Sequence, residues 1–144
     1  MFKLISILFI LILSGCASRS VTSPNPVLFG TNSNHFAPLG DKKIENYTIQ
    51  LYSSPSSPVR GRNVLKVHLE NSNGQPISDA KISFDLDMTN MSHGKNIVPA
   101  TPLGSGDYQG NVNFMMPGPW RVLVGIEQGG QTSTVRFDFI VKSQ

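Results

Sequence analysis

Apolar and polar residues alternate with a period of two along most of the chain after residue 44, and this pattern constrains the fold more than any other feature. In the stretch AKISFDLDM, residues 80–88, apolar side chains occupy every second position and point away from Lys81, Ser83 and Asp85. Such alternation is typical of a β-strand with one buried and one solvated face, because successive side chains point to opposite sides of a strand. No segment shows a sustained helical period, so the sequence predicts an all-β domain.

Turn-forming residues separate the alternating stretches. Glycine, proline and asparagine gather between them, as expected of tight turns. Seven such stretches over residues 45–144 predict an immunoglobulin-like antiparallel β-sandwich of about seven strands. One of them, NIVPAT at residues 96–101, is expected to be a short edge strand, because Pro99 cannot donate a hydrogen bond to a neighbour. Cys16 is the only cysteine, so Trp120 and the phenylalanines must fill the core without a disulfide.

The first residues predict export to the bacterial cell envelope. Residues 1–15 combine one basic residue, an apolar run and small residues, which is the layout of a secretory signal peptide. The sequence Leu13-Ser14-Gly15-Cys16 resembles the lipobox of bacterial lipoproteins, in which the cysteine is lipidated and becomes the first residue of the mature protein. The alternative is an ordinary signal peptide followed by an incidental cysteine.

Lipidation at Cys16 would hold the chain at a membrane by acyl chains and not by a spanning helix. No aspartate follows the cysteine to suggest retention at the inner membrane. In a cell with two membranes we therefore expect the periplasmic face of the outer membrane.

Residues 16–44 are predicted to be the lipidated N-terminus and a flexible linker. Serine, asparagine, proline and glycine dominate this segment, and no periodicity persists along it. Such a composition favours a tether over a packed element. The folded domain is accordingly predicted at residues 45–144.

Methionines gather in two turn-rich segments, DMTNMSHGKN at residues 87–96 and FMMPGPW at residues 114–120. In a sandwich built from consecutive antiparallel strands, the third and fifth strands end at the same pole. The two segments follow these strands and are therefore expected to lie at one pole. The candidate metal ligands there are Met88, Met91, His93, Met115 and Met116.

Two interpretations of these residues stay open. Met88 and Met116 have the inward parity of their strands, and methionine fills irregular gaps in cores. Met91 and His93 lie beyond the strand in a polar turn, where no packing role is evident, and Met115 has outward parity. Thioether and imidazole groups together suit a soft ion such as Cu(I) or Ag(I), and a thioether needs no deprotonation to bind it.

Several short motifs follow one another in the order found in one bacterial domain family. They are Gly61-x-Asn63, Asn73 to Ile77, His93-Gly94, Gly106-x-Tyr108 and Met116-x-Gly118-x-Trp120. In these motifs the chain resembles the YtkA-like domain, which is related to the FixH proteins, from about Tyr47 to Val141. The resemblance implies an immunoglobulin-like fold, no known catalytic activity and an envelope location. It also implies an association with copper handling, cytochrome oxidase assembly or metal efflux.

Neither an enzyme nor a nucleic-acid binder is expected. The twelve basic and nine acidic residues are scattered without runs, so the sequence lacks the clustered basic residues of a nucleic-acid binder. The chain has no nucleophile elbow, nucleotide-binding glycine loop or metalloprotease motif. Asp85 and Asp87 share a strand face that is expected to be solvated, and His68 faces outward with no identifiable partner.

Two functions from different classes therefore remain. The first is an envelope lipoprotein that binds Cu(I) through the methionine and histidine cluster, and delivers it to an oxidase or an efflux system. The second is a metal-free interaction module of an envelope protein complex, in which exposed methionines form an adaptable contact surface.

Overall fold

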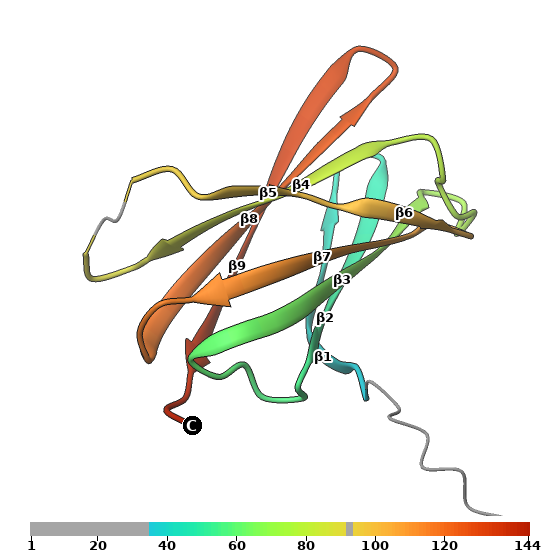
Figure 1. Cartoon of the computed structure of the whole chain (residues 1–144). Helices are drawn as coiled ribbons and strands as arrows, with labels where there is room; N and C mark the ends of the chain where they lie inside the picture. The colour runs from blue at the N-terminus through green and yellow to red at the C-terminus, as the bar shows by residue number, and fades with distance from the viewer. Residues whose placement is uncertain (1–34, 92–93) are drawn as a thin grey trace, which may run out of the picture. The chain divides into compact units, whose positions relative to one another are not determined.

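The computed structural model describes residues 35–91 and 94–144, which form two packed antiparallel β-sheets (Figure 1). The first sheet has the order β1-β2-β3-β7-β6, and its strands are β1 (Ala37–Ile44), β2 (Tyr47–Ser54), β3 (Gly61–Asn71), β7 (Asp107–Phe114) and β6 (Thr101–Gly104). The second has the order β5-β4-β8-β9, and its strands are β5 (Ile97–Pro99), β4 (Lys81–Met88), β8 (Gly118–Gln128) and β9 (Gln131–Val141). The predicted antiparallel β-sandwich is confirmed.

The described residues form nine strands, and one of the two additional strands corrects the predicted linker. β1 lies within residues 16–44, so the first sheet begins eight residues before the predicted boundary at residue 45. β1 shows no clean alternation because it is an edge strand and is mostly exposed. Its backbone pairs with β2, while Leu39 and Ile44 pack against the core.

The other additional strand arises where the chain passes from one sheet to the other. The stretch NIVPAT was predicted to be one edge strand, but it contains β5 and the start of β6, which belong to different sheets. Only Ala100 separates them, and its N–H donates to the carbonyl oxygen of Ile82 over 2.9 Å. Two short edge strands on opposite sheets therefore replace the single one.

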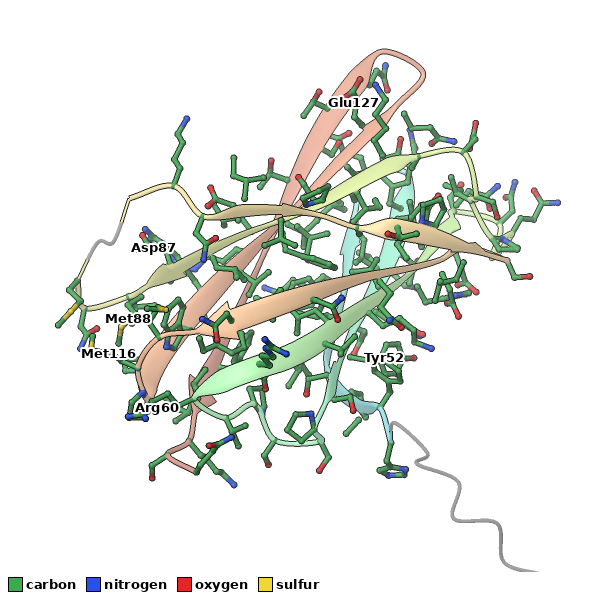
Figure 2. All side chains as sticks on the ribbon, in the orientation of Figure 1. Tyr52, Arg60, Asp87, Met88, Met116 and Glu127 are labelled. Atoms are coloured by element: carbon green, nitrogen blue, oxygen red, sulfur yellow. The ribbon has the colours of Figure 1, made fainter. Side chains whose placement is uncertain are left out.

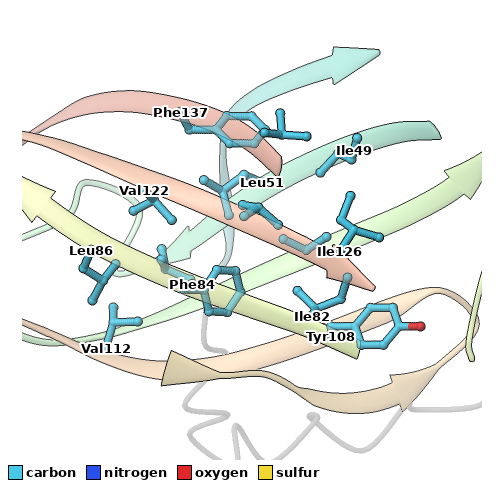
Figure 3. Packing of buried hydrophobic residues seen from close by; sticks show 14 of the residues in the cluster. Ile49, Leu51, Ile82, Phe84, Leu86, Tyr108, Val112, Val122, Ile126 and Phe137 are labelled. Carbon is cyan, nitrogen blue, oxygen red and sulfur yellow. The ribbon is translucent and has the colours of Figure 1, made fainter. Parts of the chain in front are cut away.

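The core lies between the sheets and contains the apolar positions of the alternating stretches. Along β4 every second residue from Ile82 to Met88 is buried, and Figure 3 shows Phe84 and Leu86 facing Val112 across the interior. The largest fully buried side chains are Trp120, Tyr108, Phe84 and Phe114. These aromatic residues fill the space between the sheets, as the absence of a second cysteine requires.

The buried hydroxyl of Tyr108 fixes the connection between β3 and β4. It donates to the carbonyl oxygen of Ile77 over 2.8 Å and accepts from the N–H of Ala80 over 3.1 Å. A buried hydroxyl without partners would be costly, and here it satisfies two backbone groups of the loop.

Asn63 fixes the loop between β2 and β3 in a similar way. Its side chain is only 3% exposed. The amide donates to the carbonyl oxygens of Val59 and Gly61 over 2.7 and 2.9 Å, and its oxygen accepts from the N–H of Val59 over 3.0 Å. These bonds hold the backbone on both sides of Arg60 and so position the start of β3.

Candidate metal site

The two methionine-bearing segments meet at one end of the sandwich, as predicted. Met88 at the end of β4 pairs with Trp120 of β8, and the N–H of Thr89 donates to the carbonyl oxygen of Pro119 over 3.1 Å. The methyl group of Met88 lies 3.2 Å from where a Cβ atom on Gly118 would stand. Figure 2 shows Met88 beside Met116 at this end. We call this end, with Met88, Met91, Met115 and Met116, the methionine pole.

Burial divides these methionines into two classes. Met88 is 4% exposed and belongs to the core, and Met116 is partly buried against it. Met91 and Met115 are 47% and 66% exposed and are among the most exposed large apolar side chains of the described residues. Core packing therefore explains Met88 and most of Met116, whereas Met91 and Met115 present their thioethers to solvent.

The turn between β7 and β8 is held firmly in place. The indole N–H of Trp120 donates to the carbonyl oxygen of Met116 over 2.9 Å. The Trp120 ring also contacts Phe114 edge to face, with 5.0 Å between the ring centroids. Beside the turn, the amide of Asn113 donates to the sulfur of Met115 over 3.3 Å. Met115 is thus exposed on a rigid turn, which favours a defined position for its sulfur.

The donors at this pole suit a soft ion. Among residues 35–91 and 94–144, no three His, Cys, Asp or Glu side chains converge as a metal site, whereas thioethers are the ligands that Cu(I) prefers. The predicted ligand His93 lies outside the described residues, as does the lipidation site Cys16. The fit to Cu(I) therefore rests on Met91 and Met115, with Met116 next to Met115 in the chain.

An ion pair on the outer face of β4 and β8 lies next to this pole. Arg121 donates to a carboxylate oxygen of Asp87 over 2.6 Å. The two residues line a small hollow of about 190 Å³ together with Asp85, Gly94 and Lys95. Sequence reasoning expected Asp87 on a solvated face and missed Arg121, because the partner is 34 residues away along the chain.

His68 also has partners that the sequence did not reveal. Its Nδ1 atom lies 2.7 Å from Asp107 and its Nε2 atom 3.3 Å from Glu70, on the outer face of β3 and β7. Lys66 lies 3.5 Å from the same Asp107 carboxylate and 5.1 Å from the centre of the Tyr52 ring. These residues form a mixed-charge surface network away from the methionine pole.

Two described side chains away from the methionine pole, Tyr108 and Arg136, have a shifted pKa. Burial raises the pKa of the Tyr108 hydroxyl, the hydrogen bond from Ala80 opposes this shift, and the charge of Asp79 adds to it. The hydrogen bonds to Asp138 raise the pKa of the exposed Arg136 guanidinium. The thioethers of the pole do not ionise, so metal binding by them would be insensitive to moderate acid.

Comparison with known proteins identifies one family. A model of the YtkA-like family matches residues 41–125, from within β1 to most of β8. No sequence among curated proteins is significantly similar to the chain. No helix in the described part of the chain is long and apolar enough to cross a membrane.

Two solved structures are similar in fold. The soluble domain of PmoD from Methylocystis is 18% identical with a TM-score of 0.51, over 70% of this chain and 95% of that one. A DUF4426 family protein from Pseudomonas aeruginosa is 10% identical with a TM-score of 0.52, over 72% of this chain and 96% of that one. At these identities the likeness shows the β-sandwich fold.

Proposed function

This chain belongs to the YtkA-like family, and from that premise we propose that it is a copper-handling protein of the bacterial envelope, which binds Cu(I) at the methionine pole. The observation that carries the proposal is the exposure of two thioethers, Met91 and Met115, on segments that pack together. Exposed methionine in a polar turn adds nothing to the core, whereas it is a suitable ligand for a soft cation.

The proposed ligands have different roles. Met91 and Met115 bind the ion directly, and His93 supplies an imidazole from the same turn as Met91. Met116 is half-buried beside Met115 and is the third thioether of the site. Met88 supports the site by packing under Gly118, because its own side chain is buried. Thioethers and imidazole are less readily oxidised than an exposed thiolate, which suits ligands in an oxidising envelope.

The rest of the proposed function concerns location and partners. Lipidation at Cys16 would anchor the chain to a membrane, with the periplasmic face of the outer membrane as the proposed site. The protein would deliver copper to an oxidase under assembly or to an efflux system, without catalysing a reaction or binding nucleic acid. Support comes from the resemblance of residues 13–16 to a lipobox and from the copper handling that the family resemblance implies.

An anaerobic titration with Cu(I) against a colorimetric chelator tests the proposal on the full chain in neutral detergent. We expect stoichiometric binding that is lost when Met91→Leu is combined with His93→Ala, and weakened at least tenfold by Met115→Leu. Met88→Leu is the matched control. It changes a buried thioether to a side chain of similar volume, so binding should stay within about twofold and stability within about 1.5 kcal/mol.

Either of two results would reject the copper site. One is failure of the chain to compete for Cu(I), and the other is equal loss of binding in the Met88 control and in the Met91 and His93 variant. The same exposed methionines would then favour the second function, an interaction module without metal, since methionine-rich surfaces adapt to different partners.

A further inference from the structure

A second hollow, which we call the groove, lies on the outer face of the first sheet, close to the methionine pole. It has a volume of about 720 Å³ and is lined by side chains of β2, β3 and β7 and of the loop after β2. Arg62 of β3 lies opposite Asn113 of β7, and Val64 lies opposite Asn111. This volume is within the range of ligand-binding clefts and exceeds what a single small anion needs.

Arg62 is the cation that lines this groove. Among the described residues, Lys66, Lys81, Arg121 and Arg136 each pair with an acidic side chain, whereas Arg62 pairs with none. A planar guanidinium matches a carboxylate with two parallel hydrogen bonds and is the side chain best suited to that group. Arg62 is therefore available to a carboxylate from another molecule.

Two more basic residues lie beside the groove. The N–H of Arg60 donates to the carbonyl oxygen of Lys142 over 2.8 Å, so the two residues are neighbours at the start of β3. Neither forms an ion pair with a carboxylate in the part of the chain that the structure describes. The Lys142 ammonium group donates to the hydroxyl of Ser57 over 3.3 Å. The surroundings of the groove thus add positive charge.

The remaining lining suits a peptide backbone. Asn111 is exposed, and its side-chain amide makes no hydrogen bond to another described residue. Asn113 uses one N–H for the sulfur of Met115, which leaves its oxygen as an acceptor. Side-chain amides both donate and accept, as a peptide backbone requires, while Pro55 and Val64 add apolar surface to the groove.

We propose that this groove binds an acidic peptide segment of a partner protein, with Arg62 pairing a carboxylate and the amides of Asn111 and Asn113 bonding the backbone. Arg62 is exposed but lines a hollow of about 720 Å³, and such a concave site fits an inserted segment better than a flat lipid surface. Because Asn113 also contacts Met115, the segment would lie beside the methionine pole. The inference goes beyond the proposed function and does not depend on copper.

Fluorescence anisotropy with the metal-free full chain in neutral detergent tests this inference at about 0.15 M salt, where the screening length is about 8 Å. The probe is fluorescein-labelled hexaglutamate, compared with an equally labelled Gly-Ser hexapeptide. We expect saturable binding of hexaglutamate only. Arg62→Gln should weaken it about tenfold, which is about 1.4 kcal/mol, because the charged hydrogen bonds of the guanidinium are lost.

Arg136→Gln is the matched control, because it removes the same charge from the outer face of the other sheet. It should change the affinity for hexaglutamate by less than about twofold, because a single exposed charge outside the groove has little effect. Arg62→Lys keeps the positive charge but lacks the planar guanidinium. Its affinity for hexaglutamate should lie between those of the parent chain and Arg62→Gln. Arg62→Lys also provides a second test if Arg62→Gln does not fold, which thermal unfolding of each variant would reveal.

Four results would overturn the inference. The first is equal binding of the two peptides, and the second is an equal loss of hexaglutamate affinity in the Arg62 and Arg136 variants. The third is full competition by inorganic phosphate at the concentration of the peptide. The fourth is Arg62-dependent binding to phosphatidylglycerol vesicles without binding to hexaglutamate. Cu(I) titration of Arg62→Gln separates the copper proposal from the peptide proposal, since this variant should bind Cu(I) as the parent chain does.

Discussion

At the scale of single residues, Tyr108 links a buried polar atom to both stability and pH dependence. Its hydroxyl satisfies the carbonyl oxygen of Ile77 and the N–H of Ala80 inside the domain. Removal of the hydroxyl leaves both backbone groups without this partner, and the penalty for an unsatisfied buried group is about 1–3 kcal/mol. The hydroxyl therefore contributes more than its size suggests.

We predict that Tyr108→Phe lowers the free energy of unfolding by about 2 kcal/mol, within the range for a lost buried hydrogen bond. Urea unfolding at neutral pH measures the change. Tyr52→Phe is the control, because the Tyr52 hydroxyl bonds only to Gln50 at the surface, and its loss should cost no more than about 0.5 kcal/mol. Equal costs for the two variants would contradict the role of Tyr108.

The same residue predicts a loss of stability in alkali. Its pKa is raised in the folded state, chiefly by burial, so above the ordinary pKa of about 10 the unfolded chain loses the Tyr108 proton more readily than the folded one. Stability then falls as pH rises. The difference in unfolding free energy between the parent and Tyr108→Phe should narrow from pH 9 to pH 11, and a constant difference would contradict the raised pKa.

Parity along the strands predicted which methionines are buried, but not which polar groups pair. The inward parity of Met88 on β4 agrees with its burial, whereas Met116 lies beyond the end of β7 and is only partly buried. The position of Met91 in a polar turn agrees with its exposure. The partners of Asp87 and His68 come from strands far along the chain. Such pairs depend on strand order, which alternation alone does not encode.

At the scale of elements, β1 shows why the domain boundary was placed too late. Its sequence APLGDKKI lacks alternation, because an edge strand that is mostly exposed needs no continuous apolar face. It is nevertheless held by seven residue pairings with β2 and by the position of Lys42 over the Phe137 ring, 5.7 Å from its centre. Backbone pairing, which is independent of side-chain type, defines this strand.

We predict that a chain beginning at Glu45 is less stable than one beginning at His35 by about 2 kcal/mol or more, since burial of one apolar side chain contributes about 1.5–3 kcal/mol. Removal of β1 uncovers the side of the core that Leu39 and Ile44 cover and leaves the edge of β2 unpaired. Urea unfolding of the two chains measures the difference. Equal stability would show that β1 adds nothing to the fold.

The chains that begin at Glu45 and at His35 should also differ in self-association. An unpaired β2 edge is a template for pairing with another chain, so the shorter chain should also self-associate at concentrations at which the longer one is monomeric. Sedimentation velocity would show this. A short edge strand rich in lysine, such as β1, is one way in which natural sheets avoid such pairing.

At the scale of the whole molecule, charge is distributed unevenly between the two ends of the sandwich. The end far from the methionine pole carries the acidic residues Glu45, Asp79, Asp107 and Glu127, and the last two pair with Lys66 and Lys81. Arg60, Arg62 and Lys95 lie at or near the methionine pole, and Figure 2 shows Arg60 and Glu127 at opposite ends. Such a distribution would orient an acidic partner toward the methionine pole during approach.

No disulfide within the chain can hold the sheets together, since Cys16 is the only cysteine. We predict that a reducing agent leaves the midpoint of thermal unfolding unchanged, within about 1 °C. Loss of a native disulfide would cost about 2–5 kcal/mol, and each kcal/mol lowers the midpoint by about 4–8 °C in a domain of this size. A lower midpoint after reduction would reveal a disulfide between two chains.

The passage from β5 to β6 ties the two layers together along one side. Because Ala100 alone separates these strands, a slide of one sheet past the other would have to break the pairing of Phe84 with Val98 or of Thr101 with Gln109. The short backbone connection through Ala100 therefore restrains the two sheets from sliding past each other. A force that pulls on β5 is therefore transmitted through Ala100 to β6 in the other sheet.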